Sequence, residues 1–118
     1  MSDPTIPLTT LEYDQWGNPE NQEDFDYMLS YSPYDNLQNV EYPHLLLTTG
    51  YNDPRVAYWE PAKFLARLRD RAKNGNLSLL QTNFSAGHAG ASGRYDSLME
   101  NALDFAFLID KLAVENQA

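Results

Sequence analysis

The chain has 118 residues, which fit a single domain, and 42% of them are hydrophobic. Its formal net charge of −9 argues against a nucleic-acid partner, because phosphate binding requires a basic surface. There is no cysteine, which excludes disulfides, thiol catalysis and cysteine zinc sites and favours a cytoplasmic location. We find neither an apolar run long enough to cross a membrane nor a signal peptide.

Residues 1–40 are predicted to form an irregular acidic arm with one short helix. The first 54 residues contain ten Asp and Glu and no Lys or Arg. This acidic half is either an ordinary solvated surface or a surface that attracts cationic ligands. Within the stretch NQEDFDYMLSY, Phe25, Met28 and Leu29 share one helical face, and Asn21 is a candidate N-cap.

Residues 41–118 are predicted to fold as strand, helix, strand and helix. The apolar run HLLLTTG at 44–50 indicates a buried strand, and LSLLQTNF at 77–84 indicates a second one. A helix between them at 61–73 makes this a parallel β-α-β unit with a right-handed crossover. Two strands with two helices do not cover themselves well, so we interpret the chain as a piece of a larger α/β sheet.

Both helices of this part are predicted from the spacing of apolar residues. On the first, Phe64, Leu65, Leu68 and Ala72 fall on one face, and the pair Asn74-Gly75 is expected to end the helix. On the last helix, apolar residues recur at intervals of four, three, four and three, at Leu98, Ala102, Phe105, Ile109 and Leu112.

An acid and a histidine follow the two predicted strands. Asp53 lies in GYNDPRV after the first strand, and His88 lies in FSAGHAG after the second. Parallel strands end at one edge of a sheet, so the two side chains should emerge there together. An imidazole held by a carboxylate can take the proton of a serine hydroxyl, and acid before histidine is the chain order of an α/β-hydrolase triad. The G-x-S-x-G motif that would supply the serine is absent.

These residues also have plainer interpretations. Asp53 precedes Pro54 and could be a turn residue, while His44 opens a buried strand and is expected to be structural. The glycines around His88 imitate a phosphate loop, but the G-x-G-x-x-G pattern and the P-loop lysine are missing. No close ligand spacing supports a metal site at these histidines and Asp53, so we expect neither a metal nor a cofactor.

Several strings resemble the prolyl oligopeptidase family of serine peptidases. The resemblance covers about residues 7–114 and is carried by EYDQWGNPE, YSPYDNLQNVEYPHLLLTTGYNDPRVAYWEPAKFLARLR and SAGHAGASGRY. That family combines a β-propeller with an α/β-hydrolase domain. The resemblance therefore implies that this chain is a C-terminal part of the hydrolase domain, without the propeller and without the serine.

The resemblance implies roles for five residues. Asp53 would be the triad acid, His88 the general base, and Arg55 a ligand for a backbone carbonyl of the substrate. Glu12 matches a carboxylate that holds the Arg or Lys before the scissile bond. Asp14 stands where a second carboxylate, usually the longer Glu, is expected.

The implied enzyme is a serine-type endopeptidase that cleaves short basic peptides, and the isolated chain is expected to be inactive because it lacks the nucleophile. The rival hypothesis is a non-enzymatic interaction module, or a truncated piece that self-associates. Because an open strand edge and an apolar face would meet water, we expect the chain to form a homo-oligomer, by edge pairing or by exchange of the N-terminal arm or the last helix. Residues expected to meet water on that face are Leu45, Leu47, Phe105 and Ile109.

Overall fold

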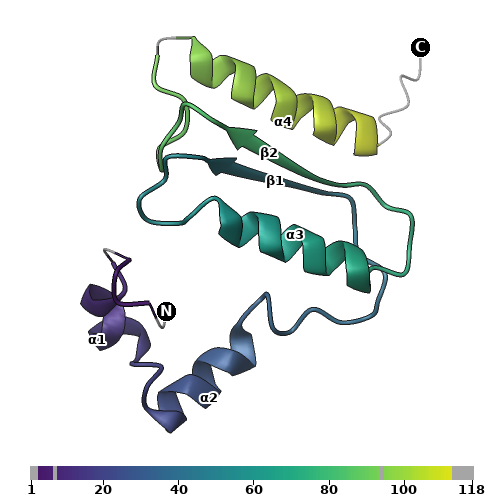
Figure 1. Ribbon diagram of the computed structural model, residues 1–118. Coiled ribbons are helices and arrows are strands. Elements are labelled where there is room, and N and C mark those ends of the chain that lie inside the picture. Colours follow the sequence, from purple (N-terminus) through teal and green to yellow (C-terminus); the bar gives the residue numbers. More distant parts are fainter. Residues whose placement is uncertain (1–2, 7, 94, 113–118) are drawn as a thin grey trace, which may run out of the picture.

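The computed structural model describes residues 3–6, 8–93 and 95–112. Its strand-helix-strand-helix order after the arm confirms the sequence prediction, and the predicted short helix near residues 21–31 is also present. The arm holds two further short helices that the sequence analysis missed. In chain order (Figure 1) the elements are η1 (Thr10–Glu12), α1 (Tyr13–Trp16), α2 (Gln22–Tyr31), β1 (Leu45–Gly50), α3 (Trp59–Arg71), β2 (Ser78–Asn83) and α4 (Asp96–Leu112). The end of the predicted last helix, 113–114, lies outside the described residues.

The strands β1 and β2 form a two-stranded parallel sheet, as predicted. Leu45 pairs with Ser78 at one end, and Gly50 pairs with Asn83 at the other. In Figure 1 the two strands lie between α3 and α4. Because the strands run in the same direction, the loops that follow them leave from the same edge of the sheet.

The core lies between α3 and one face of the sheet. Leu65 and Leu68 of α3 are buried together with Leu37 from the segment before β1. The expectation that Leu45 and Leu47 meet water is therefore wrong, because alternate strand residues share a face and α3 covers this one. Partly buried residues that pack against the core are Tyr42, Leu45, Leu47, Phe64 and Leu80.

Helix α4 leaves its apolar stripe exposed. The predicted spacing does form a helix, but among its described residues none is buried. The expected exposure of Phe105 and Ile109 is confirmed, and Leu98 and Leu112 are also more than half exposed. No helix in the described part of the chain is long and apolar enough to cross a membrane.

Helix α3 ends before the Asn74-Gly75 pair that was predicted to stop it. Its last residue is Arg71, and Ala72, predicted to lie on the helix face, is the C-cap in an extended conformation. The Nδ2 group of Asn74 donates instead to the carbonyl oxygen of Tyr42 at 2.7 Å. The asparagine therefore ties the segment before β1 to the segment after α3.

Helix α2 begins where the sequence predicted, with Asn21 at the N-cap position. The Asn21 side chain forms no capping hydrogen bond, however; its Nδ2 group donates to Oδ2 of Asp24 at 3.2 Å. The same Asp24 oxygen accepts the backbone N–H of Asn18 at 2.9 Å. Asp24 thus joins the start of α2 to the turn that precedes it.

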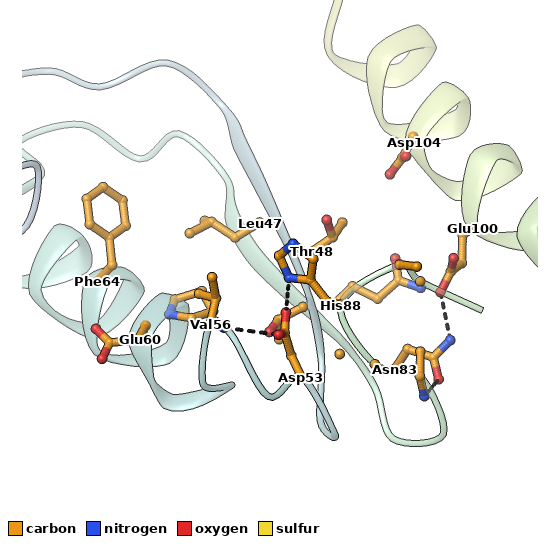
Figure 2. A pocket seen from close by; sticks show the side chains of 18 of the residues that line it. Leu47, Thr48, Asp53, Val56, Glu60, Phe64, Asn83, His88, Glu100 and Asp104 are labelled. Atoms are coloured by element: carbon orange, nitrogen blue, oxygen red, sulfur yellow. Dashed lines mark hydrogen bonds and ion pairs between the residues drawn. The ribbon is translucent and has the colours of Figure 1, made fainter. Parts of the chain in front are cut away.

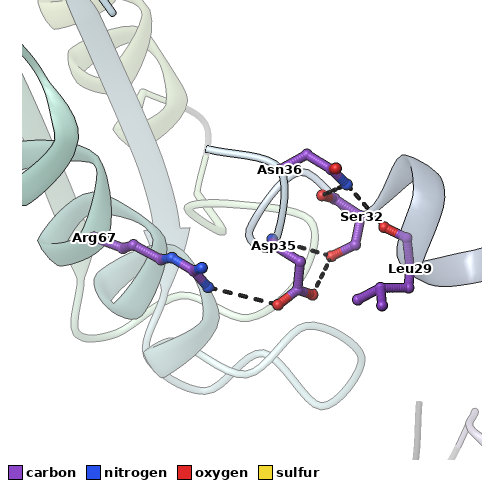
Figure 3. Close-up of polar contacts among 5 residues, drawn as sticks. All are labelled: Leu29, Ser32, Asp35, Asn36 and Arg67. Carbon is purple, nitrogen blue, oxygen red and sulfur yellow. Dashed lines mark hydrogen bonds and ion pairs between the residues drawn. The ribbon is translucent and has the colours of Figure 1, made fainter. Parts of the chain in front are cut away.

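A turn after α2 connects the arm to α3. Asp35 Oδ1 lies 3.5 Å from Nη1 of Arg67, and Asp35 Oδ2 accepts the hydroxyl of Ser32 at 2.7 Å (Figure 3). Asn36 Nδ2 donates to the carbonyl oxygens of Ser32 and Leu29, both at 2.8 Å. The ion pair is partly exposed and contributes at most about 1 kcal/mol, so the turn is held by the whole network rather than by that pair.

Candidate active site

The loop after β1 holds Asp53 in a turn. Asp53 Oδ1 accepts the backbone N–H groups of Arg55 at 2.8 Å and Val56 at 3.0 Å. The turn interpretation of Asp53 is therefore correct, since this is how an aspartate closes a turn on its own backbone. The second carboxylate oxygen, Oδ2, takes no part in the turn and points toward the loop after β2 (Figure 2).

His88 meets this second oxygen. Its Nδ1 lies 2.8 Å from Asp53 Oδ2 (Figure 2). An ionised carboxylate only accepts hydrogen bonds, so Nδ1 carries the proton and the neutral ring has Nε2 free as an acceptor. The Asp53 side chain is only 9% exposed, whereas that of His88 is 46% exposed. The arrangement shields the carboxylate and leaves the ring accessible.

Hydrogen bonds keep Asp53 ionised. Desolvation by burial raises its pKa, but the N–H groups of Val56 and Arg55 and the imidazole of His88 together outweigh this effect. The pKa therefore lies below the ordinary value of 3.8. At neutral pH the carboxylate carries its charge and can stabilise a protonated His88. The stabilising contribution of this charge is present above the ordinary pKa and is lost as the pH falls through the lowered one.

Close backbone packing fixes the loop that carries His88. The backbone N–H of Asn52, in the loop after β1, donates to the carbonyl oxygen of Ala86 at 3.0 Å. A Cβ atom on Gly50 would lie 2.5 Å from the carbonyl oxygen of Gly87. Only glycine therefore lets the end of β1 approach the histidine loop this closely.

A cavity of about 790 Å³ lies beside the Asp53–His88 pair, between the sheet and both helices (Figure 2). The ends of both strands line it, together with Phe64 of α3 and Asn101 of α4. Its described lining contains no Lys or Arg, and its acidic residues are Asp53, Glu60, Glu100 and Asp104. This composition suits a ligand with a cationic group.

Glu12 lines a second cavity that adjoins the first. This cavity has a volume of about 670 Å³ and is bounded by the arm and the start of α3. Phe25, Met28 and Leu29 all line it, so the predicted shared face of α2 is confirmed. The two cavities have three lining residues in common, Ser32, Tyr34 and Glu60.

Asp14 and Arg55 lie outside both cavities. Each is exposed, and among the described residues neither side chain forms an ion pair. The structure thus brings Asp53 and His88 into contact and places Glu12 in the adjoining cavity. The other two predicted site residues remain at the surface.

His44 has the structural role expected for it. Its Nδ1 accepts the backbone N–H of Leu77 at 2.8 Å. It precedes β1 whereas His88 follows β2, so the two histidines lie at opposite ends of the parallel strands. Within the described ranges no group of three His, Cys, Asp or Glu is arranged to hold a metal ion.

Glu100 and Asn83 were not predicted from the sequence. Glu100 Oε1 accepts Nδ2 of Asn83 at 2.7 Å, and Oε2 accepts the backbone N–H of Ala91 at 3.1 Å. The bond from Asn83, then that from Ala91, hold the pKa of Glu100 below its ordinary value of 4.5, although desolvation opposes them. The sequence offers only a weak signal here, a polar residue at the end of a strand, and none for the glutamate.

The parallel strand pair, with an acid and a histidine in contact at its carboxyl edge, defines an α/β protein of the hydrolase type. The model of the prolyl oligopeptidase family matches residues 1–115, and the chain belongs to this family. The resemblance found in the sequence is thereby confirmed.

Individual relatives agree with this assignment. The chain is 56% identical over 98% of its length to Protease 2 of Moraxella lacunata, and 53% identical over 99% to dipeptidyl aminopeptidase BI of Pseudoxanthomonas mexicana. It spans only 17% and 16% of the lengths of these relatives.

Solved structures show the same fold. Oligopeptidase B from Leishmania major superposes with a TM-score of 0.91 at 47% identity, covering 94% of this chain and 15% of that one. Oligopeptidase B from Trypanosoma brucei, with covalently bound antipain, gives a TM-score of 0.91 at 50% identity, covering 97% of this chain and 16% of that one.

Proposed function

We propose that this chain forms the C-terminal part of the catalytic domain of a cytoplasmic serine oligopeptidase, which hydrolyses short peptides after Arg or Lys. Membership of the prolyl oligopeptidase family supports the reaction class. The observation that carries the proposal is the 2.8 Å contact between Asp53 and His88 at the carboxyl edge of the sheet. Because these 118 residues contain no G-x-S-x-G, the nucleophilic serine comes from outside them.

In the proposed mechanism His88 is the general base. Its Nε2 takes the proton of the serine hydroxyl as the oxygen attacks the scissile carbonyl carbon, and later returns the proton to the leaving amine. Asp53 keeps the other ring nitrogen protonated and stabilises the imidazolium that forms. The backbone N–H groups of Arg55 and Val56 restrain the carboxylate, so that Oδ2 stays directed at the ring.

Glu12 is the proposed ligand of the basic side chain. Its cavity adjoins that of His88, so a peptide whose carbonyl group lies at His88 can extend an Arg or Lys side chain toward Glu12. Trp16 and Phe25 line the same cavity, as does Lys63, and aromatic rings attract cations. Asp14 and Arg55, which lie at the surface, are proposed to contact the peptide only in the assembled enzyme.

A chimera tests this proposal. Protease 2 of Moraxella lacunata would receive this chain in place of its matching segment, to which it is 56% identical. We expect the chimera to react with a fluorophosphonate at the serine of the recipient and to hydrolyse an arginyl amide in preference to an alanyl amide. The isolated chain should do neither, since loss of a triad serine costs on the order of 10⁶ in turnover. A labelled, folded chimera without arginyl preference would refute the proposed specificity.

A second candidate function is a non-enzymatic module that self-associates. The observation in its favour is the exposed apolar stripe of α4, because large apolar surfaces are seldom left open in soluble monomers. We propose that the isolated chain forms a homo-oligomer through this stripe or through an open strand edge. A folded chimera that neither reacts with the fluorophosphonate nor hydrolyses the arginyl amide would favour this candidate.

A further inference from the structure

We propose that Glu100 is a positioning residue, whose carboxylate fastens both ends of the loop that carries His88 and so holds the imidazole against Asp53. The inference rests on the proposed function, because that function makes His88 the general base. The contacts that support it, however, are properties of the folded chain and can be measured without any reaction.

The two oxygens of Glu100 bind on opposite sides of His88 in the sequence. Oε1 accepts Nδ2 of Asn83, the last residue of β2, at 2.7 Å, and Oε2 accepts the backbone N–H of Ala91 at 3.1 Å (Figure 2 shows the Asn83 bond). One carboxylate therefore joins two points that lie eight positions apart, with the histidine between them. Breaking the bond to Ala91 would remove a restraint on the backbone at one end of the loop, and breaking the bond to Asn83 would remove the restraint on its side-chain amide at the other end.

Glu100 also fixes the orientation of the Asn83 amide. An ionised carboxylate accepts but does not donate, so Asn83 must turn its NH₂ group toward Glu100 and its oxygen toward the loop. That oxygen accepts the backbone N–H groups of Ser85 at 3.0 Å and Ala86 at 3.1 Å. The conformation of the first residues after β2 thus depends on the charge of Glu100.

The other end of the loop fits closely against the same carboxylate. Gly90 has a φ of +80°, and a Cβ atom there would lie 3.0 Å from Glu100 Oε2. Its backbone N–H donates to the carbonyl oxygen of Gly87 at 3.2 Å, which closes the reversal that contains His88. Glycine at this position supplies the left-handed backbone and also makes room for the Glu100 side chain.

Polar contacts matter here because α4 has few apolar ones. Its described residues include none that is buried, so apolar packing does little to fix the helix against the strands. Among the described side-chain hydrogen bonds, those of Glu100 are the ones that connect α4 to the histidine loop. The lowered pKa of Glu100 agrees with an ionised carboxylate at neutral pH, which can accept both bonds at once.

The two histidines of the chain allow a direct test by nitrogen-15 NMR. His88 Nδ1 contacts a carboxylate and is expected to carry the proton, whereas His44 Nδ1 accepts an N–H and leaves the proton on Nε2. The folded chain should therefore show two opposite tautomers near neutral pH, with a protected Nδ1 proton only on His88. His44 is an internal reference in the same spectrum.

Glu100→Gln is the informative variant, because the amide has similar shape but presents one acceptor oxygen and one donor group. We expect loss of the protected Nδ1 proton of His88 and a mixture of its tautomers, with the His44 signals unchanged. Asp104→Asn is the matched control, since it makes the same charge change about one turn along α4, at the same cavity. This control should keep the His88 signals of the wild type.

A folded Glu100→Gln protein with the wild-type His88 signals would overturn the proposal. Should that variant fail to fold, Glu100→Asp keeps the charge but is one methylene shorter and cannot reach both ends of the loop. It is expected to show the same loss at His88, and retention of the His88 signals in it would equally refute the role. The NMR experiment does not depend on peptide cleavage. An inactive chimera would therefore disprove the proposed function but would leave the NMR result for Glu100 unchanged.

Discussion

Helices α3 and α4 have similar apolar spacing but very different surroundings. Leu65 and Leu68 of α3 are 6% and 0% exposed, whereas Phe105 and Ile109 of α4 are 64% and 62% exposed. Both stripes predict a helix, and both helices form. The difference shows that periodicity identifies the face a helix will bury, while burial itself depends on whether a covering surface is present.

The two site residues repeat this contrast. Asp53 is held by backbone N–H groups of its own turn, in the loop that leads into α3. The loop of His88 depends in addition on Glu100, a side chain from α4. The part of the molecule near α3 is thus well packed within this chain. The part near α4, in contrast, is held by a few polar contacts.

The largest effect is expected where the two sides meet, at the Asp53–His88 bond. In the chimera with Protease 2, Asp53→Asn should lower turnover about 10⁴-fold, the value known for the corresponding change in chymotrypsin-like enzymes, because the amide permits the wrong imidazole tautomer. Steady-state hydrolysis of an arginyl amide measures this.

Asp70→Asn is the control for that change. Asp70 is an exposed acid of α3 that lines neither cavity, so its substitution should leave turnover unchanged. A loss below about tenfold for Asp53→Asn would mean that Asp53 serves only the turn and that another acid supports His88.

Substitution of Glu12 tests whether the N-terminal arm contributes to substrate binding together with the well-packed part of the molecule near α3. Glu12→Gln in the chimera should lower kcat/KM for an arginyl substrate, because the positively charged arginine side chain loses its carboxylate partner. The loss corresponds to about 2–5 kcal/mol of transition-state stabilisation. Activity toward an alanyl substrate should hardly change. Glu20→Gln, in the same arm but outside the Glu12 cavity, is the control. Unchanged arginine preference would remove Glu12 from the specificity site.

A pair of stability measurements sharpens the comparison of the helices. Leu68→Ala should lower the free energy of unfolding by about 2–5 kcal/mol, because it leaves a cavity in the core. Ile109→Ala should change it by less than about 0.5 kcal/mol when the protein is dilute enough to be monomeric. Urea unfolding followed by circular dichroism gives both values. Equal losses would show that α4 is buried in solution.

Much of this architecture could be predicted from sequence because local rules determine it. The runs at β1 and β2 and the spacing in α3 and α4 specified their elements, and strand order placed Asp53 and His88 at one edge. Leu45 and Leu47 were misjudged because the sequence does not say which strand face α3 covers. Helix α3 ends at Arg71, before Asn74, and the bond of Asn74 to Tyr42, far away in sequence, has no local signal.

The site shows the same limit. The resemblance to the family assigned roles to Asp53, His88 and Glu12, because it carries over only residues that the family's motifs contain. It did not find Glu100, since a glutamate on an exposed helical turn is normally a solvated charge. Its importance arises from two bonds to a loop that only the folded chain brings near, and no local pattern encodes them.

The smallest expected effect concerns the exposed stripe itself. If α4 is the incomplete side, the isolated chain should associate through it, and Phe105→Glu should shift the assembly toward monomer by placing a charge in the contact. Phe84→Glu makes the same chemical change at an exposed position outside α4, and it should leave the assembly as it is. Light scattering across micromolar concentrations measures both. Phe105 meets water in the free chain, so its substitution costs little folding free energy, and any change in mass reports on association alone. A wild-type chain that stays monomeric would mean that α4 remains open without a partner, and the homo-oligomer proposal would then be wrong.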